Sequence, residues 1–135
     1  MDFKFLNMLS TDIGIDLGTA NSLIHVRGKG IVVDEPSIVA LDRRTDKPVA
    51  IGERARQMHG KTHDNIYTIR PLRDGVIADF NAAEQMIRGM IKMINNKPTM
   101  FNPALKMVVC IPSGATEVER RAVRDSSEHA GGRDV

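Results

Sequence analysis

The order of apolar and polar residues along the first 51 positions predicts short β-strands joined by tight turns. Apolar residues alternate with small or polar ones over residues 13–18, and residues 22–26 form a second apolar run, so residues 19–21 are expected to be the turn of a hairpin. Further strands of an antiparallel meander are predicted at residues 30–33, 37–41 and 49–51. The last two of these pair across the polar turn of residues 42–48.

Two amphipathic helices are predicted in the second half of the chain. Asn81 and Glu84 have the spacing of a capping box, and apolar residues then recur at helical spacing up to Ile94. The second helix is expected over residues 116–130, where two successive glycines end it. The section before the first of these helices has weaker signals, which indicate a short helix over residues 53–59 and a strand over residues 66–69 that ends before Pro71.

A continuous apolar run at residues 107–111 is typical of a strand that is buried on both faces. It contains Cys110, the single cysteine of the chain, which is expected to act as a small buried hydrophobic residue. With no second cysteine to pair with it, the chain suits a reducing cytoplasm.

Composition indicates an ordinary folded domain. Apolar residues make up 41% of the 135 residues and charged residues 27%, which is far from the balance of a disordered chain. The 19 basic and 17 acidic residues are scattered along the chain, so nucleic-acid binding is disfavoured. No apolar run approaches the roughly 20 residues of a transmembrane helix, and the N-terminus does not read as a secretory signal.

The N-terminal segment and the C-terminal end of the chain each lead to a prediction. Residues 1–9 would be weakly amphipathic if they were helical. The chain stops at Val135, directly after a helix and its glycines, at a point where a doubly wound fold would supply another strand. We therefore expect a sheet that lacks its later members.

The first candidate site is the turn between the first two strands. A tight turn that contains Gly18 can aim backbone N–H groups and the Thr19 hydroxyl at a phosphate. Asp16, at the end of the preceding strand, can hold a hydrated Mg²⁺ beside it. The same residues also fit a purely structural hairpin turn, and on spacing alone that explanation is favoured.

The second candidate site is the turn into the last helix. Glu119 lies in the first helical turn, where a carboxylate could orient a water molecule. Thr116 and Glu119 also have the Thr-x-x-Glu spacing of a capping box, and on physical grounds alone the cap is favoured.

Other chemistries have little support in the sequence. The histidines come with no cysteine pair or carboxylate cluster, which disfavours a transition-metal site. Ser113 is not in the Gly-x-Ser-x-Gly setting of a hydrolase nucleophile.

Four segments together resemble a known family. Residues 13–22 (IGIDLGTANS) resemble the first phosphate motif of the superfamily of actin, hexokinase and the heat-shock chaperones. The segments most similar to the MreB family of bacterial actin-like proteins are residues 28–40, 69–80 and 111–122. The 70-kilodalton chaperones have Thr-Thr-Asn where this chain has Thr-Ala-Asn at residues 19–21, and they lack the Glu-Arg-Arg-Ala segment of residues 119–122. The resemblance therefore favours the MreB family over a chaperone or a sugar kinase.

The resemblance implies a fold and a set of site residues. The fold would be the α/β, ribonuclease H-like fold of actin-like ATPases, with residues 1–135 as the N-terminal portion, a mixed sheet and flanking helices. Asp16 would lie beside Mg²⁺, and Glu119 would position the attacking water. The residues that embrace the ATP phosphates would be Gly18, Thr19, Ala20 and Asn21. At both candidate sites the resemblance reverses the preference for a structural explanation.

The resemblance also implies partners and a location. The protein would determine cell shape by assembling into filaments, at the inner face of the membrane and together with cell-wall elongation proteins, with residues 1–10 as a membrane-binding segment. The family's second phosphate motif, adenosine motif and second domain would lie beyond residue 135, so we expect weak or no ATP binding by the isolated chain, and whether it is an enzyme stays open. The alternatives are a chaperone- or sugar-kinase-type ATPase and a catalytically silent fragment.

Overall fold

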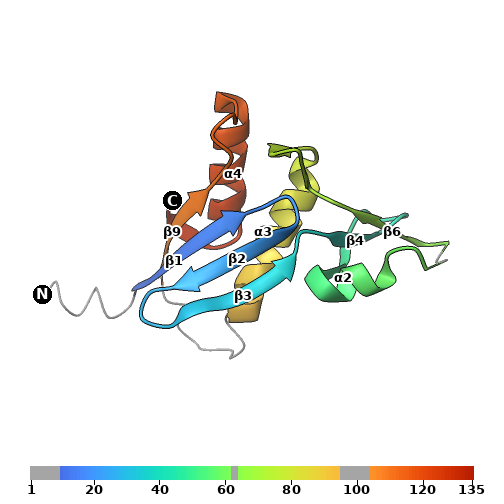
Figure 1. Cartoon of the computed structure of the whole chain (residues 1–135), viewed down its shortest axis with the longest axis horizontal. Helices are drawn as coiled ribbons and strands as arrows, with labels where there is room; N and C mark the ends of the chain where they lie inside the picture. Colours follow the sequence, from blue (N-terminus) through green and yellow to red (C-terminus); the bar gives the residue numbers. More distant parts are fainter. Residues whose placement is uncertain (1–9, 62–63, 95–103) are drawn as a thin grey trace, which may run out of the picture.

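The computed structural model describes residues 10–61, 64–94 and 104–135 (Figure 1). Its main element is a five-stranded mixed sheet in the order β10-β9-β1-β2-β3. The strands are β1 (Ser10–Leu17), β2 (Asn21–Val26), β3 (Gly30–Pro36), β9 (Ala104–Cys110) and β10 (Gly132–Asp134). The first three are antiparallel, which confirms the predicted hairpin, and β9 and β10 are parallel to β1.

The parallel pairing of β1 with β9 decides where the candidate residues meet. Asp16 lies opposite Cys110, each near the carboxyl end of its strand. Figure 1 shows these two strands side by side and pointing in the same direction. The turn after β1 and the loop after β9 therefore leave the sheet at the same edge, which is where open α/β sheets bind ligands.

Helices α3 (Phe80–Ile94) and α4 (Glu117–His129) supply the main core together with one face of this sheet. Ile13 and Ile15 of β1 belong to the same buried cluster as Met86 and Ile87 of α3. Burial of an aliphatic side chain of this size contributes about 1.5–3 kcal/mol. Residues at every second position of a strand and every third or fourth position of a helix thus form one apolar layer.

The opposite face of the sheet is exposed at β9, so the prediction that residues 107–111 are buried on both faces was wrong. Met107 is buried, but the Val108 side chain is 69% exposed and Cys110 is exposed as well. Strand β9 is therefore covered on one face, because the core cluster that includes α3 and α4 lies on the side of Met107. A run of apolar letters did not reveal this alternation, and the prediction of a buried thiol was wrong.

The start of one helix also differs from prediction. Helix α3 begins at Phe80, and the Asp79 carboxylate accepts the N–H of Ala82 at 2.8 Å, so Asp79 caps the helix in place of the predicted Asn81. Helix α4, in contrast, ends as predicted: its last residue is His129, Ala130 is its C-cap, and Gly131 adopts a φ of 118°. The chain then enters β10 at once, so the strand that we expected to be missing begins here.

A small lobe follows β3. It consists of helix α2 (Gly52–Met58) and a three-stranded sheet in the order β5-β4-β6. Its strands are β4 (Val39–Asp42), β5 (Pro48–Ile51) and β6 (Ile66–Ile69). Val39 lies opposite Ile51, as the predicted hairpin required, but these strands form a sheet separate from that of β1–β3. Ile38, Ala40 and Ala55 form a second buried cluster inside the lobe.

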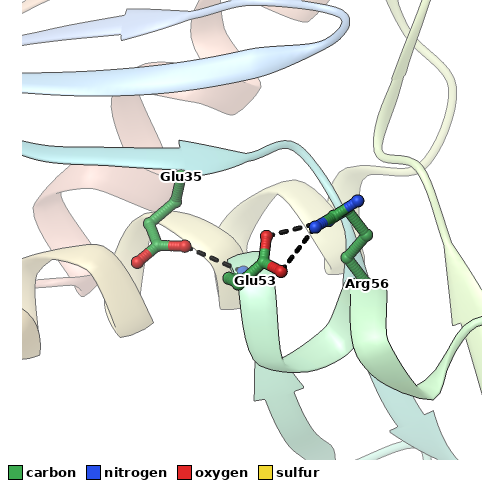
Figure 2. Close-up of polar contacts among 3 residues, drawn as sticks. All are labelled: Glu35, Glu53 and Arg56. Carbon is green, nitrogen blue, oxygen red and sulfur yellow. Dashed lines mark hydrogen bonds and ion pairs between the residues drawn. The ribbon is translucent and has the colours of Figure 1, made fainter.

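The small lobe is joined to the main sheet by a carboxylate from β3. The Glu35 side chain accepts the backbone N–H of Glu53 at 2.8 Å, and Glu53 in turn pairs with Arg56 (Figure 2). Glycine is favoured at position 52, because its φ is +64° and a Cβ atom there would force the Glu35 carboxylate to move. The contact fixes the start of α2 against the end of β3.

A second hairpin, β7 (Leu72–Arg73) with β8 (Val76–Ile77), was not predicted. Its two-residue turn is formed by Asp74 and Gly75, both with positive φ.

Among the described residues, no helix is long and apolar enough to cross a membrane. Residues 1–9, which would be weakly amphipathic if they were helical, lie outside the described residues.

Candidate functional site

The first candidate segment is the turn that joins β1 to β2. Leu17 pairs with Ser22, so residues 18–21 form a four-residue loop, which we call the phosphate turn. Thr19, Ala20 and Asn21 are exposed, and so is the Asp16 side chain just before the turn. The structure therefore presents the predicted residues to solvent at the carboxyl edge of the sheet.

Only glycine fits at the start of the phosphate turn. A Cβ atom on Gly18 would lie 2.3 Å from the carbonyl oxygen of Asn21, a separation that real Cβ atoms do not adopt. The backbone consequently folds back on itself more closely than any other residue allows. Such a turn brings backbone groups near to one another, as a phosphate cradle requires.

The phosphate turn is held from outside by β3 and the residue that follows it. The Asn21 side chain donates to Asp34 at 3.0 Å. The Ser37 hydroxyl donates to the carbonyl oxygen of Gly18 at 2.6 Å, and the Ser37 N–H donates to the carbonyl oxygen of Ala20 at 2.8 Å. These partners are 13 or more residues away in sequence, so tertiary structure sets the shape of the turn.

The tip of the β7-β8 hairpin lies between the two candidate segments. The N–H of Gly75 reaches the Thr19 hydroxyl at 3.4 Å, and a Cβ atom on Gly75 would lie 3.7 Å from Cβ of Pro112. Pro112 lies in the loop that leads from β9 into α4. The hairpin thus connects the phosphate turn with the loop before Glu119.

The second candidate segment, the start of α4, contains the predicted capping box. The Thr116 hydroxyl accepts the N–H of Glu119 at 3.2 Å, and the Glu119 carboxylate accepts the N–H of Thr116 at 2.8 Å. Glu119 is half-buried, whereas Glu117, in the same helical turn, is exposed. One carboxylate oxygen of Glu119 is engaged in the cap, and this geometry leaves its predicted role with water untested.

Reasoning from sequence missed two residues of this region. Gly75 had a signal, since an Asp-Gly pair is a strong indicator of a two-residue hairpin turn. Ser37 had none, because nothing in the local sequence shows that a serine after Pro36 will contact the turn of another hairpin.

The acidic and histidine side chains do not form a transition-metal site in the described part of the chain, where no three His, Cys, Asp or Glu residues could hold one ion together. Magnesium differs in this respect, since it keeps several waters and commonly takes one or two carboxylates. Asp16, exposed at the end of β1, has the chemistry for such a ligand.

The sequence of the chain is similar to those of known proteins. Residues 10–135 match the model of the MreB/Mbl protein family. The chain is 52% identical over 128 residues to the cell shape-determining protein Mbl of Bacillus subtilis, covering 95% of this chain and 38% of Mbl. It is 50% identical to the cell shape-determining protein MreB of Escherichia coli, covering 98% of this chain and 39% of that protein. The chain thus spans less than half of the length of these relatives.

Solved structures show the same fold. The ADP-bound MreB5 of Spiroplasma citri superposes with a TM-score of 0.77 at 38% identity, over 93% of this chain and 37% of that one. The double helical filament of MamK gives a TM-score of 0.70 at 19% identity, over 93% of this chain and 39% of that one, a likeness that shows the fold alone. The predicted α/β, actin-like fold is therefore confirmed. Because the family match extends from residue 10 to residue 135, the chain belongs to the MreB/Mbl family.

Proposed function

We propose that this chain provides the first phosphate-binding half of an ATP site in an actin-like protein that determines cell shape. The observation that carries the proposal is the meeting of the phosphate turn and the loop before α4 at one edge of the sheet, with Gly75 beside both. Its relatives are cell shape-determining proteins, and MreB5 of Spiroplasma citri has been crystallised with ADP and with AMPPNP.

In this proposal the phosphate turn surrounds the ATP phosphates and Asp16 holds Mg²⁺ through its waters. The residues fit these ligands. The turn exposes Thr19 and requires glycine at position 18, and a carboxylate is an oxygen ligand of the kind that Mg²⁺ prefers. Bound Mg²⁺ would offset the negative charge of the phosphates during phosphoryl transfer.

Glu119 has two roles in the proposal. It caps α4 through one carboxylate oxygen, and its charge orients the water that attacks the terminal phosphate. The cap supports the second role, because a side chain held in one position orients water better than a freely rotating one.

The proposal extends to assembly and location. Residues 1–135 form the N-terminal portion of an actin-like ATPase that polymerises head to tail in the cytoplasm. The filament lies against the inner face of the membrane through residues 1–10 and works with cell-wall elongation proteins. Weak binding by each N-terminal segment adds up along a filament.

The test places the chain in a longer relative. Residues 10–135 replace the matching region of Bacillus subtilis Mbl, and Mg-ATP binding, phosphate release and sedimentation are measured. Asp16→Ala is expected to reduce Mg-ATP affinity by about tenfold or more, since it removes a charge next to the metal. Glu119→Gln is expected to reduce phosphate release at unchanged affinity, because glutamine keeps the capping box but loses the charge.

The matched control is Glu117→Gln, which removes an exposed carboxylate from the same helical turn. It is expected to leave phosphate release unchanged. Equal losses in both glutamine variants would contradict the role of Glu119, and unchanged ATP affinity in Asp16→Ala would contradict the site. A swapped Mbl that restores rod shape without binding ATP would favour the silent-fragment alternative.

The isolated 135-residue chain provides a separate test. We expect weak or no Mg-ATP binding by it, because only one side of the nucleotide would be in contact with protein. Saturable micromolar binding that Asp16→Ala abolishes would show instead that this half of the site is sufficient.

A further inference from the structure

We propose that Ser37 is a positioning residue for the phosphate turn, which it orients without touching the nucleotide. The inference rests on the proposed function, since it assigns the residue that shapes the same site. Ser37 is the residue after β3, its side chain is fully buried, and it makes two separate hydrogen bonds to the phosphate turn.

The hydrogen-bond directions follow from counting protons. A serine hydroxyl has one proton to donate and two lone pairs to accept with. Ser37 donates its proton to the carbonyl oxygen of Gly18, so in its 2.8 Å contact with Ser22 it must be the acceptor. Ser22 therefore donates to Ser37, and Ser37 donates to Gly18, in a chain of two bonds inside the protein.

This chain of bonds orients a peptide group. In a trans peptide, the C=O of one residue and the N–H of the next point in opposite directions. The peptide between Gly18 and Thr19 is trans, and its C=O points at the Ser37 hydroxyl. The N–H of Thr19 consequently points away from Ser37, as a donor to a bound phosphate must.

Ser37 also carries the chain from the main sheet into the small lobe. Glu35, two residues earlier, accepts the N–H of Glu53 in the first turn of α2 (Figure 2), and the carbonyl oxygen of Ile38 accepts the N–H of Gly52 at 2.9 Å. The backbone of Ser37 is thus fixed from both sides, which makes it a rigid support for the turn. Ser22 and Ser37 are both 0% exposed, so water cannot replace a lost partner.

The test compares two serine deletions that are matched in burial. Ser37→Ala removes the hydrogen bond to Gly18 and the contact with Ser22. Ser22→Ala removes the contact with Ser37 alone and leaves the Ser37 proton on Gly18. Both variants are measured in the 135-residue chain by NMR relaxation of the Thr19 amide, and in the swapped Mbl by Mg-ATP affinity.

We expect the order parameter of the Thr19 amide to fall below about 0.6 in Ser37→Ala and to stay near 0.85 in Ser22→Ala. Mg-ATP affinity should fall about tenfold in Ser37→Ala and by no more than about twofold in Ser22→Ala. Ser37→Cys, which fits the same space with a weak donor, should resemble Ser37→Ala and covers the case in which the alanine variant does not fold.

A rigid Thr19 amide in both Ser37 variants would overturn the proposal, and so would equal losses of ATP affinity in Ser37→Ala and Ser22→Ala. The two readouts separate this inference from the proposed function. If the swapped Mbl binds no ATP at all, the proposed site fails, while the NMR comparison still decides whether Ser37 orients the turn.

Discussion

The phosphate turn and the start of α4 lie near the same edge of the sheet but are stabilised in different ways. The phosphate turn is fixed by residues far along the chain, chiefly Asp34, Ser37 and Gly75. The start of α4 is fixed by itself, because Thr116 and Glu119 are three residues apart and satisfy each other's backbone N–H groups.

Because of this difference, we expect mutations in the two regions to affect the structure over different distances. A change near the phosphate turn should spread to β3, because Asp34 of β3 and Ser37, which follows β3, contact the turn directly. It should reach the small lobe only through β3, because Glu35 of β3 accepts the N–H of Glu53 in α2. A change at the start of α4 should remain local, because the capping box involves one helical turn.

The strongest test of this contrast exchanges a glycine for alanine in each region. In Gly18→Ala the new Cβ atom would lie 2.3 Å from the Asn21 carbonyl oxygen, so the turn must open. We expect the free energy of unfolding to fall by roughly 1–3 kcal/mol, the usual cost of overpacking, and toward the upper end because the clash is with backbone. Urea unfolding measures it.

Gly114→Ala is the control, since a Cβ atom there meets nothing within 4 Å. It should be neutral, or more stable by up to about 1 kcal/mol, because alanine restricts the unfolded chain. An equal loss of unfolding free energy in Gly18→Ala and Gly114→Ala would contradict the proposed difference between the two regions.

A smaller effect is expected from the capping box. Thr116→Ala deletes the oxygen that accepts the N–H of Glu119, and the loss of an N-cap costs about 1 kcal/mol. Thr116→Ser keeps that oxygen and should be close to the original protein. Thermal unfolding followed by circular dichroism compares the two. An equal loss in the serine variant would show that the methyl group of Thr116, and not its hydroxyl, stabilises the helix.

The smallest effect concerns another locally stabilised segment, the turn after β4. Asp42 accepts the N–H of Arg44 at 2.8 Å and that of Thr45 at 3.2 Å, and chiefly the first bond lowers the pKa of its carboxyl group below the ordinary value. A lowered pKa adds stability that is complete above about pH 4 and is lost as pH falls through the pKa of the folded state. The stability difference from Asp42→Asn should therefore shrink in acid, as urea unfolding at several pH values would show. A difference that grew on acidification would contradict this assignment.

Much of the fold could be predicted because its signals are local. The first hairpin, the pairing of Val39 with Ile51, and the Thr116–Glu119 cap each depend on residues close together in sequence. The prediction of a buried thiol failed because a distant element decided the outcome. Cys110 is exposed because the core helices lie on one face of the sheet. The cap of α3 was missed for a local reason, because Asp79, two residues before Asn81, accepts the N–H of Ala82.

By itself, the sequence determined the family and the local geometry around Thr116, since hydrogen bonds within one turn depend on residue types a few positions apart. Only the tertiary structure placed the end of β1 beside the end of β9, Gly75 between the two candidate segments, and the Ser37 hydroxyl on the Gly18 carbonyl. These contacts join residues up to 94 positions apart, as for Asp16 and Cys110. The pattern of nearby residues does not encode such contacts, because they form only when the sheet assembles and its strands select their neighbours.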